Sequence, residues 1–141
     1  MASQLDLAKQ LLCRAADDEA AAKALLHVGA VTDVIVGFHA QQGVEKSIKA
    51  VLAANGVDFP FSHDIGRLAA LASKAGHPLP NALHSADELS AYAGALRYEP
   101  DDPESVDRET GLRWATTAVT WAQAQIEDAE ERAAANDEAA D

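Results

Sequence analysis

The order of apolar and polar positions predicts an all-helical chain. Apolar residues recur at steps of three and four, as on the buried face of an α-helix. Alternation with a period of two and Val/Ile/Thr-rich runs, which mark strands, are nearly absent. Turn residues divide this pattern into five expected helices, at about residues 5–27, 32–55, 62–74, 85–96 and 103–134.

Residues that favour helix ends stand at several of these boundaries. Asn55-Gly56 is a C-terminal stop, because both residues tolerate the left-handed conformation of a C-cap. Ser62 is expected to cap the third helix, and Ser85–Glu88 fits a capping box for the fourth. Asp102-Pro103 predicts the start of the fifth, with proline at the first helical position.

Length and composition agree with a single small domain. The chain has 141 residues, 48% hydrophobic but only 5% aromatic, and alanine, the strongest helix former, dominates. We predict an all-α fold, an up-and-down four-helix bundle with an additional short helix. The bundle is expected over residues 16–134, after an N-terminal helical extension at 1–15 and before an acidic disordered tail at 135–141.

Charge and cysteine content restrict the function further. The formal net charge is −12, and half of it lies in residues 127–141, so the surface argues against direct nucleic-acid binding. The chain has neither an apolar run of membrane-spanning length nor a signal-like N-terminus, which predicts a cytoplasmic protein. Cys13 is the single cysteine, and the histidines lack metal-like spacing; we expect no metal and no cofactor.

The second helix carries polar residues where its buried face is expected. On a helical wheel, Gln42, Glu45 and Lys49 fall in the same sector as Phe38 and its apolar neighbours. Buried charge is costly unless it is paired, and Glu45 and Lys49 have the i,i+4 spacing of an ion pair. Further partners are expected elsewhere in the chain, at Arg97, Tyr98, His63 and Asp64.

Two interpretations of this constellation stay open. In the first, a satisfied polar network fixes the register of the helices. In the second, the network lines a cleft for an anionic or nucleotide ligand, contacted by Lys46, Lys49 and Arg97, with His39 at its edge. On the fifth helix, Trp114 and Trp121 are expected on a face away from the Leu112–Ile126 stripe. They either pack beneath a loop or form a contact between identical copies.

Several separated motifs together resemble the HEPN family (higher eukaryotes and prokaryotes nucleotide-binding domain). These are His39-x-x-Gln42-x-x-Glu45-Lys46-x-x-Lys49-Ala50, then Phe59-Pro60, His63-Asp64-x-x-x-Leu68 and Arg97-Tyr98. The resemblance spans about residues 16–126. It implies a four- to five-helix bundle that usually dimerises and is often paired with a minimal nucleotidyltransferase.

Many members of this family are metal-independent ribonucleases that act as toxins or defence effectors. They carry an Arg-x(4–6)-His motif, in which arginine steadies the phosphate and histidine transfers protons. None of the six arginines here has a histidine five to seven residues downstream. The general acid–base step therefore lacks its usual agent.

The expected function is accordingly a non-catalytic HEPN module, so we assign no catalytic residue. It is expected to be a homodimer that binds a nucleotide, or that serves as the partner of a nucleotidyltransferase in a toxin–antitoxin-like or defence system. The alternatives are a ribonuclease toxin with a divergent site and a purely structural helical adaptor.

Overall fold

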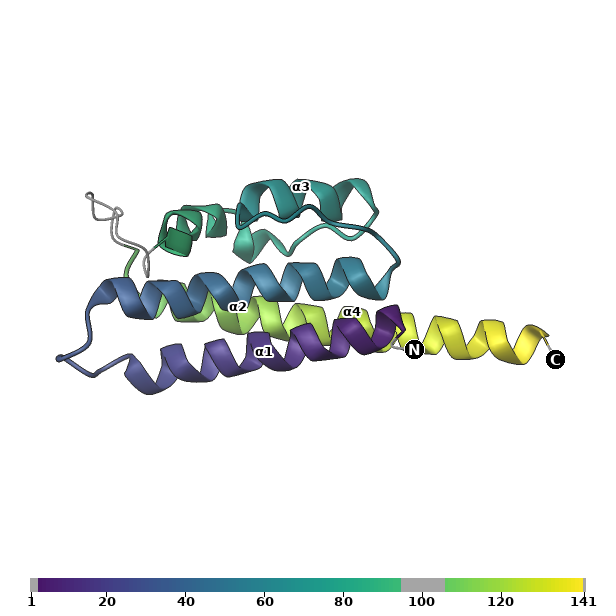
Figure 1. The fold of residues 1–141 in the computed structure, drawn as a ribbon, viewed down its shortest axis with the longest axis horizontal. Coiled ribbons are helices and arrows are strands. Elements are labelled where there is room, and N and C mark those ends of the chain that lie inside the picture. The colour runs from purple at the N-terminus through teal and green to yellow at the C-terminus, as the bar shows by residue number, and fades with distance from the viewer. Residues whose placement is uncertain (1–2, 95–105, 141) are drawn as a thin grey trace.

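The chain forms a bundle in which three long helices lie side by side. The computed structural model describes residues 3–94 and 106–140, which form helices and turns without a strand. The long helices are α1 (Gln4–Leu25), α2 (Asp33–Ala54) and α4 (Arg108–Ala140), and each packs against the other two (Figure 1). A fourth helix, α3 (Ile65–Lys74), lies on α2 together with the 3-10 segment η2 (Ala86–Gly94), and the short 3-10 segment η1 (Asn81–Leu83) contacts α4. The all-helical prediction is confirmed.

The first three helices begin and end close to their expected limits. Asn55 is the C-cap of α2, and Gly56 has a φ of +69°, in the left-handed region that glycine adopts at low cost. The expected cap of α3 was wrong by two residues. Asp64, not Ser62, is the N-cap, and its carboxylate accepts a hydrogen bond from the backbone N–H of Arg67. An aspartate cap also places negative charge at the positive end of the helix dipole.

The last two predicted helices differ more from the structure. The fourth is a 3-10 segment, although Leu89 and Tyr92 are buried there as its apolar spacing requires. The expected start at Asp102-Pro103 lies outside the described residues, and α4 begins at Arg108 after a non-helical pair. It then continues to Ala140, so residues 135–140 of the expected disordered tail extend the helix instead.

Small residues allow the long helices to approach closely. Ala8, Ala15 and Ala22, spaced by seven on α1, are completely buried. At Gly43 on α2, an added Cβ would lie 3.3 Å from Ala115 Cβ and 3.6 Å from the Ala15 carbonyl oxygen. The alanine-rich composition therefore produces tight contacts between backbones rather than a core of large side chains.

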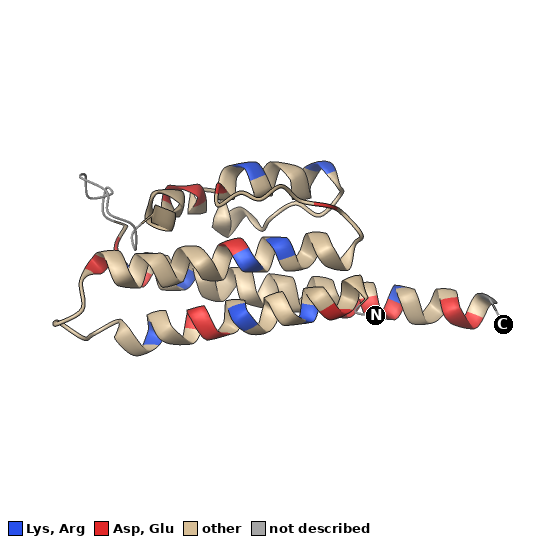
Figure 2. Cartoon of the chain, viewed as in Figure 1, with Lys and Arg blue, Asp and Glu red and all other residues tan. Residues whose placement is uncertain are grey.

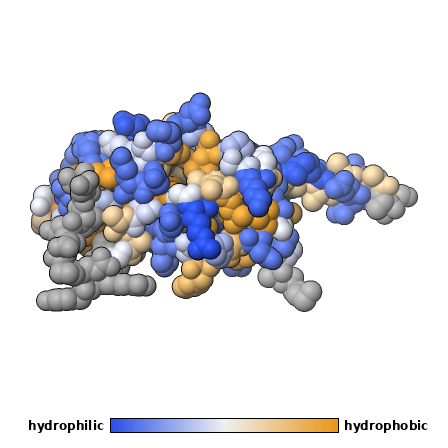
Figure 3. All heavy atoms as spheres, turned by 90° about the horizontal axis from the view of Figure 1, so that it is seen from above, coloured by the Kyte–Doolittle hydropathy of each residue, from blue (hydrophilic) through white to orange (hydrophobic). Residues whose placement is uncertain are grey.

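The distal end of α4 extends past the bundle as a single helix. Its charged side chains beyond Arg132 are acidic, Asp137 and Glu138, whereas the basic residues lie on the body of the molecule and as far along α4 as Arg132 (Figure 2). In the space-filling view the projecting end shows hydrophilic residues interspersed with alanine (Figure 3). No helix in the described ranges has both the length and the apolarity needed to span a membrane.

Candidate functional site

Glu45 is the centre of the polar network on α2. Its side chain is only 4% exposed, and its two oxygens accept three hydrogen bonds. Lys49 Nζ lies 3.0 Å from Oε2, while Gln41 Nε2 and His63 Nδ1 each lie 2.8 Å from Oε1. Because a carboxylate only accepts hydrogen bonds, His63 donates through Nδ1.

Helix geometry and one loop bring these groups together. Gln41, Glu45 and Lys49 follow one another at steps of four, so they lie on one face of α2. The loop after α2 returns along this face, which places His63 on Glu45 and the Phe59 ring 5.7 Å from Lys49 Nζ. The network thus joins α2 to the segment that leads into α3.

The amide at the buried position is Gln41, not Gln42 as predicted. Gln41 is completely buried, whereas Gln42 is half-buried and donates to Gln41 Oε1 over 2.6 Å. The wheel centred on Phe38 was rotated too far, because Phe38 itself is only half-buried and the fully buried aromatic in this layer is Tyr92.

The two lysines expected to line one cleft belong to separate clusters. Lys46 Nζ lies 2.5 Å from Asp18 Oδ2 on α1, and His39 Nδ1 lies 3.0 Å from the other oxygen of the same carboxylate. Lys49 instead pairs with Glu45 within α2. Each lysine is therefore neutralised by its own carboxylate, on a different side of the helix.

The remaining expected site residues are placed as follows. Asp64 is exposed and caps α3, and its hydrogen bonds join it to Ser62 and Arg67. Arg97 and Tyr98 lie outside the described residues. Within the described residues, every fully buried side-chain nitrogen and oxygen has a hydrogen-bond partner, so the network is satisfied without a ligand.

The two tryptophans of α4 differ in their surroundings. Trp114 is 8% exposed and belongs to the main core with Ala115 and Ala118, so the face that carries it is buried within this chain rather than free for a contact between copies. Trp121 packs against the same core but keeps an exposed edge. That edge lines a groove of about 410 Å³ with Pro80, Thr116, Thr117, Thr120 and Ala124.

Sequence reasoning missed two residues that organise these contacts. Asp18 accepts from both Lys46 and His39 of α2, and no local pattern on α1 indicates these partners. Arg108 donates to the carbonyls of Leu25, Leu26, Val28 and Val31 and to Asp33 Oδ1. It ties the start of α4 to the α1–α2 turn, a contact between residues about 80 apart that local patterns do not encode.

One surface feature beside the network is an aromatic pair. Phe61 is 99% exposed, and its ring meets the ring of His63 edge-on at 6.0 Å between centroids. The His63 side chain is 42% exposed, and its Nδ1 is fixed by Glu45, which directs Nε2 away from the network. The described residues contain no group of three or more His, Cys, Asp or Glu side chains that is arranged to hold a metal ion.

A comparison with protein families identifies the fold. The HEPN domain model matches residues 8–132. The chain belongs to the HEPN domain family. The match begins within α1 and ends at Arg132, so it covers residues 8–15, about half of the expected N-terminal helical extension. Neither the curated proteins nor the solved structures gave a significant match.

Proposed function

We propose that this HEPN domain is a non-catalytic binding module that forms a homodimer through the Trp121 groove of α4. Partnership with a nucleotidyltransferase, in a toxin–antitoxin-like or defence setting, belongs to the same proposal. The observation that carries it is the pairing of Lys46 and Lys49 with carboxylates inside the fold. Because each lysine is paired in this way, neither is available to stabilise the negative charge of a phosphate at which RNA would be cleaved.

The character of the groove supports contact between identical copies. Its six lining residues carry no formal charge, although 24% of the chain is charged and the net charge is −12. Two copies of such an acidic protein repel each other, so a contact between them is favoured where charge is absent. An exposed tryptophan edge beside threonines provides apolar area and hydrogen-bonding groups together, and tryptophan is enriched at interface centres.

Sedimentation velocity tests the dimer. The expected result is a dimer for the wild type and a monomer for Thr120→Arg, which introduces charge at an exposed position of the groove without touching the core. Trp121→Glu is the stronger perturbation, checked for folding by circular dichroism. Gln10→Arg, at an exposed position of α1, is the matched control and should remain dimeric. A monomeric wild type, or a dimer unaffected by Thr120→Arg, would refute the proposed interface.

A second candidate function is the binding of a nucleotide-like ligand beside the Glu45 network. The fully exposed Phe61 ring favours it, because an aromatic face stacks on any base. In this arrangement His63 would offer Nε2 to the ligand, and Glu45 and Lys49 would hold the imidazole and the loop in place.

Calorimetry with a panel of nucleotides tests this candidate. Binding should occur with wild type and be lost in Phe61→Ala. Leu7→Ala removes a partly exposed apolar side chain from α1 and serves as the control that should bind normally. No heat from wild type, or equal affinity in the Phe61→Ala variant, would count against the ligand.

A further inference from the structure

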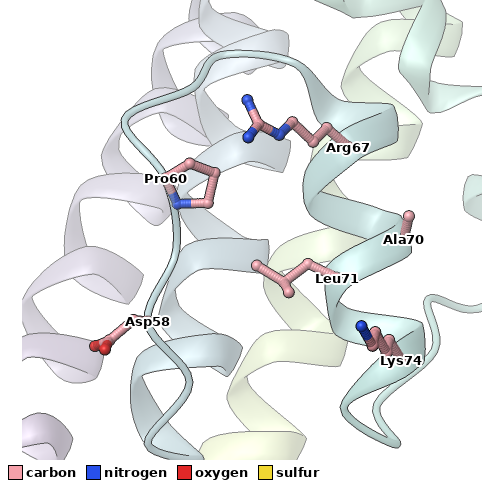
Figure 4. A pocket seen from close by; sticks show the side chains of 6 residues that line it. All are labelled: Asp58, Pro60, Arg67, Ala70, Leu71 and Lys74. Atoms are coloured by element: carbon pink, nitrogen blue, oxygen red, sulfur yellow. The ribbon is translucent and has the colours of Figure 1, made fainter.

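A groove runs along the outward face of α3. Its floor and one wall are Arg67, Ala70, Leu71 and Lys74, which follow the spacing i, i+3, i+4, i+7. Pro60, in the loop before α3, forms the opposite wall, and the groove encloses about 380 Å³ (Figure 4). Two apolar residues thus lie between two cations that are two helical turns apart.

The groove is positively charged in a strongly acidic protein. Arg67 and Lys74 are the two basic residues of α3, and both are exposed. Asp58 also borders the groove, but its carboxylate points away from α3 (Figure 4). The Arg67 side chain extends toward Pro60 above Leu71, so its guanidinium is directed over the apolar floor (Figure 4).

The projecting end of α4 repeats this spacing with the opposite charge. Glu131, Ala134, Ala135 and Glu138 follow the same i, i+3, i+4, i+7 order, and all four are exposed. Arg132, which directly follows Glu131, donates from Nη2 to Asn55 Oδ1 over 2.9 Å and so attaches the helix to the body of the bundle. Residues 134–139 beyond it are exposed and extend away from the bundle (Figure 1).

We propose that the α4 end of a second copy of this chain docks in the α3 groove. Each stripe spans seven residues, about 10 Å of helix, so two carboxylates meet two cations in register. The paired alanines then lie against Leu71 and Ala70, where their small size permits close helix packing. The α4 end of the same copy cannot enter its own groove, because α4 is one continuous helix directed away from α3 (Figure 1).

The order cation–apolar–apolar–cation reads the same in both directions, so charge alone does not set the orientation. The helix dipoles favour an antiparallel arrangement, with Glu138 on Arg67 and Glu131 on Lys74. If both copies exchange their ends, the contact is reciprocal and closes as a symmetric pair. This contact is separate from the Trp121 groove. Its exposed ion pairs are screened by salt, so the sedimentation experiments on the Trp121 groove are run at high salt, where a monomeric Thr120→Arg reports on that groove alone.

Disulfide trapping detects this contact whatever other interfaces exist. In a Cys13→Ser background, a protein with Ala70→Cys is mixed with one that carries Ala135→Cys, and both positions are exposed. A mixed disulfide should form readily. Its yield should fall at high salt, because exposed ion pairs are screened there. Ala24→Cys, exposed on α1, replaces Ala70→Cys in the control mixture. Trapping no faster than this control would overturn the proposal.

Charge reversal provides the decisive arm. One variant reverses the charge of the groove (Arg67→Glu with Lys74→Glu), and the other reverses that of the α4 end (Glu131→Lys with Glu138→Lys). When both cysteine-bearing proteins carry the same reversal, the yield of the disulfide should fall by about tenfold or more. Mixing the two variants restores opposite charges at both contacts, so trapping between them should recover. Equal trapping in all variants, or no recovery in the mixture, would refute the pairing.

Discussion

The Glu45–Lys49 pair allows the strength of the α2 network to be predicted. The perturbation is a double-mutant cycle of Glu45→Gln and Lys49→Met, two changes that keep side-chain volume. Each single change leaves one charge of the pair in place: a Lys49 ammonium whose side chain is 12% exposed, or a Glu45 carboxylate that is 4% exposed. The double change removes both charges at once.

Removing one partner of a buried ion pair costs about 3–5 kcal/mol. Here the cost is smaller, because solvent reaches Lys49 in part and Glu45 keeps hydrogen bonds from Gln41 and His63. We therefore expect about 2–3 kcal/mol for each single variant. The double variant should lose only about 1–2 kcal/mol, since the amide oxygen of a glutamine at position 45 can still accept both remaining hydrogen bonds, which share Oε1 in the wild type.

Urea unfolding, followed by circular dichroism, measures these free energies of unfolding. The expected coupling is about 3–4 kcal/mol, with the double variant more stable than the sum of the single effects predicts. Single losses below about 0.5 kcal/mol with no coupling are typical of exposed pairs. That result would refute the description of Glu45 and Lys49 as a buried network.

Three further predictions concern the packing and capping of the bundle. Gly37→Ala should destabilise the fold by about 1–3 kcal/mol in urea unfolding, because the new Cβ would lie 2.5 Å from two atoms of the Tyr92 ring; unchanged stability would contradict this close contact. Arg108→Ala should speed amide hydrogen exchange in the turn between α1 and α2, whose carbonyls it binds, and unchanged exchange would contradict that role. Hydrogen bonds from the backbone and side chain of Ser3 lower the pKa of Asp6 below its ordinary 3.8, with a smaller contribution from a nearby lysine. The stabilising effect of the Asp6 carboxylate is therefore complete above about pH 4 and is lost as pH falls through the lowered pKa; carboxyl NMR shifts should titrate below 3.8 in wild type and higher in Ser3→Ala.

Local signals predicted the fold well where they were strong. The α2 limits followed from a long apolar stripe and the Asn55-Gly56 stop, and both features are encoded by neighbouring residues. The 3-10 character of the η2 segment was not predictable in the same way. Its capping box and apolar spacing suit an α-helix equally, and its close contact between Tyr92 and Gly37 of α2 joins residues 55 apart, which local patterns do not encode.

The candidate site was predicted in part. The i,i+4 pair of Glu45 and Lys49 could be read from spacing alone, and the structure contains it. Its separation from Lys46 could not, because it depends on Asp18, which lies 28 residues away on α1. A helical wheel gives directions around one helix, but it does not say which neighbouring helix supplies the partner.

The central claim is that the polar network is a packing device and that this HEPN domain acts through binding at α4. Sedimentation velocity on two variants side by side tests it most directly. Thr120→Arg should be a folded monomer, and Glu45→Gln with Lys49→Met should remain a dimer. The opposite pattern, with the groove variant dimeric and the network variant monomeric, would contradict the account.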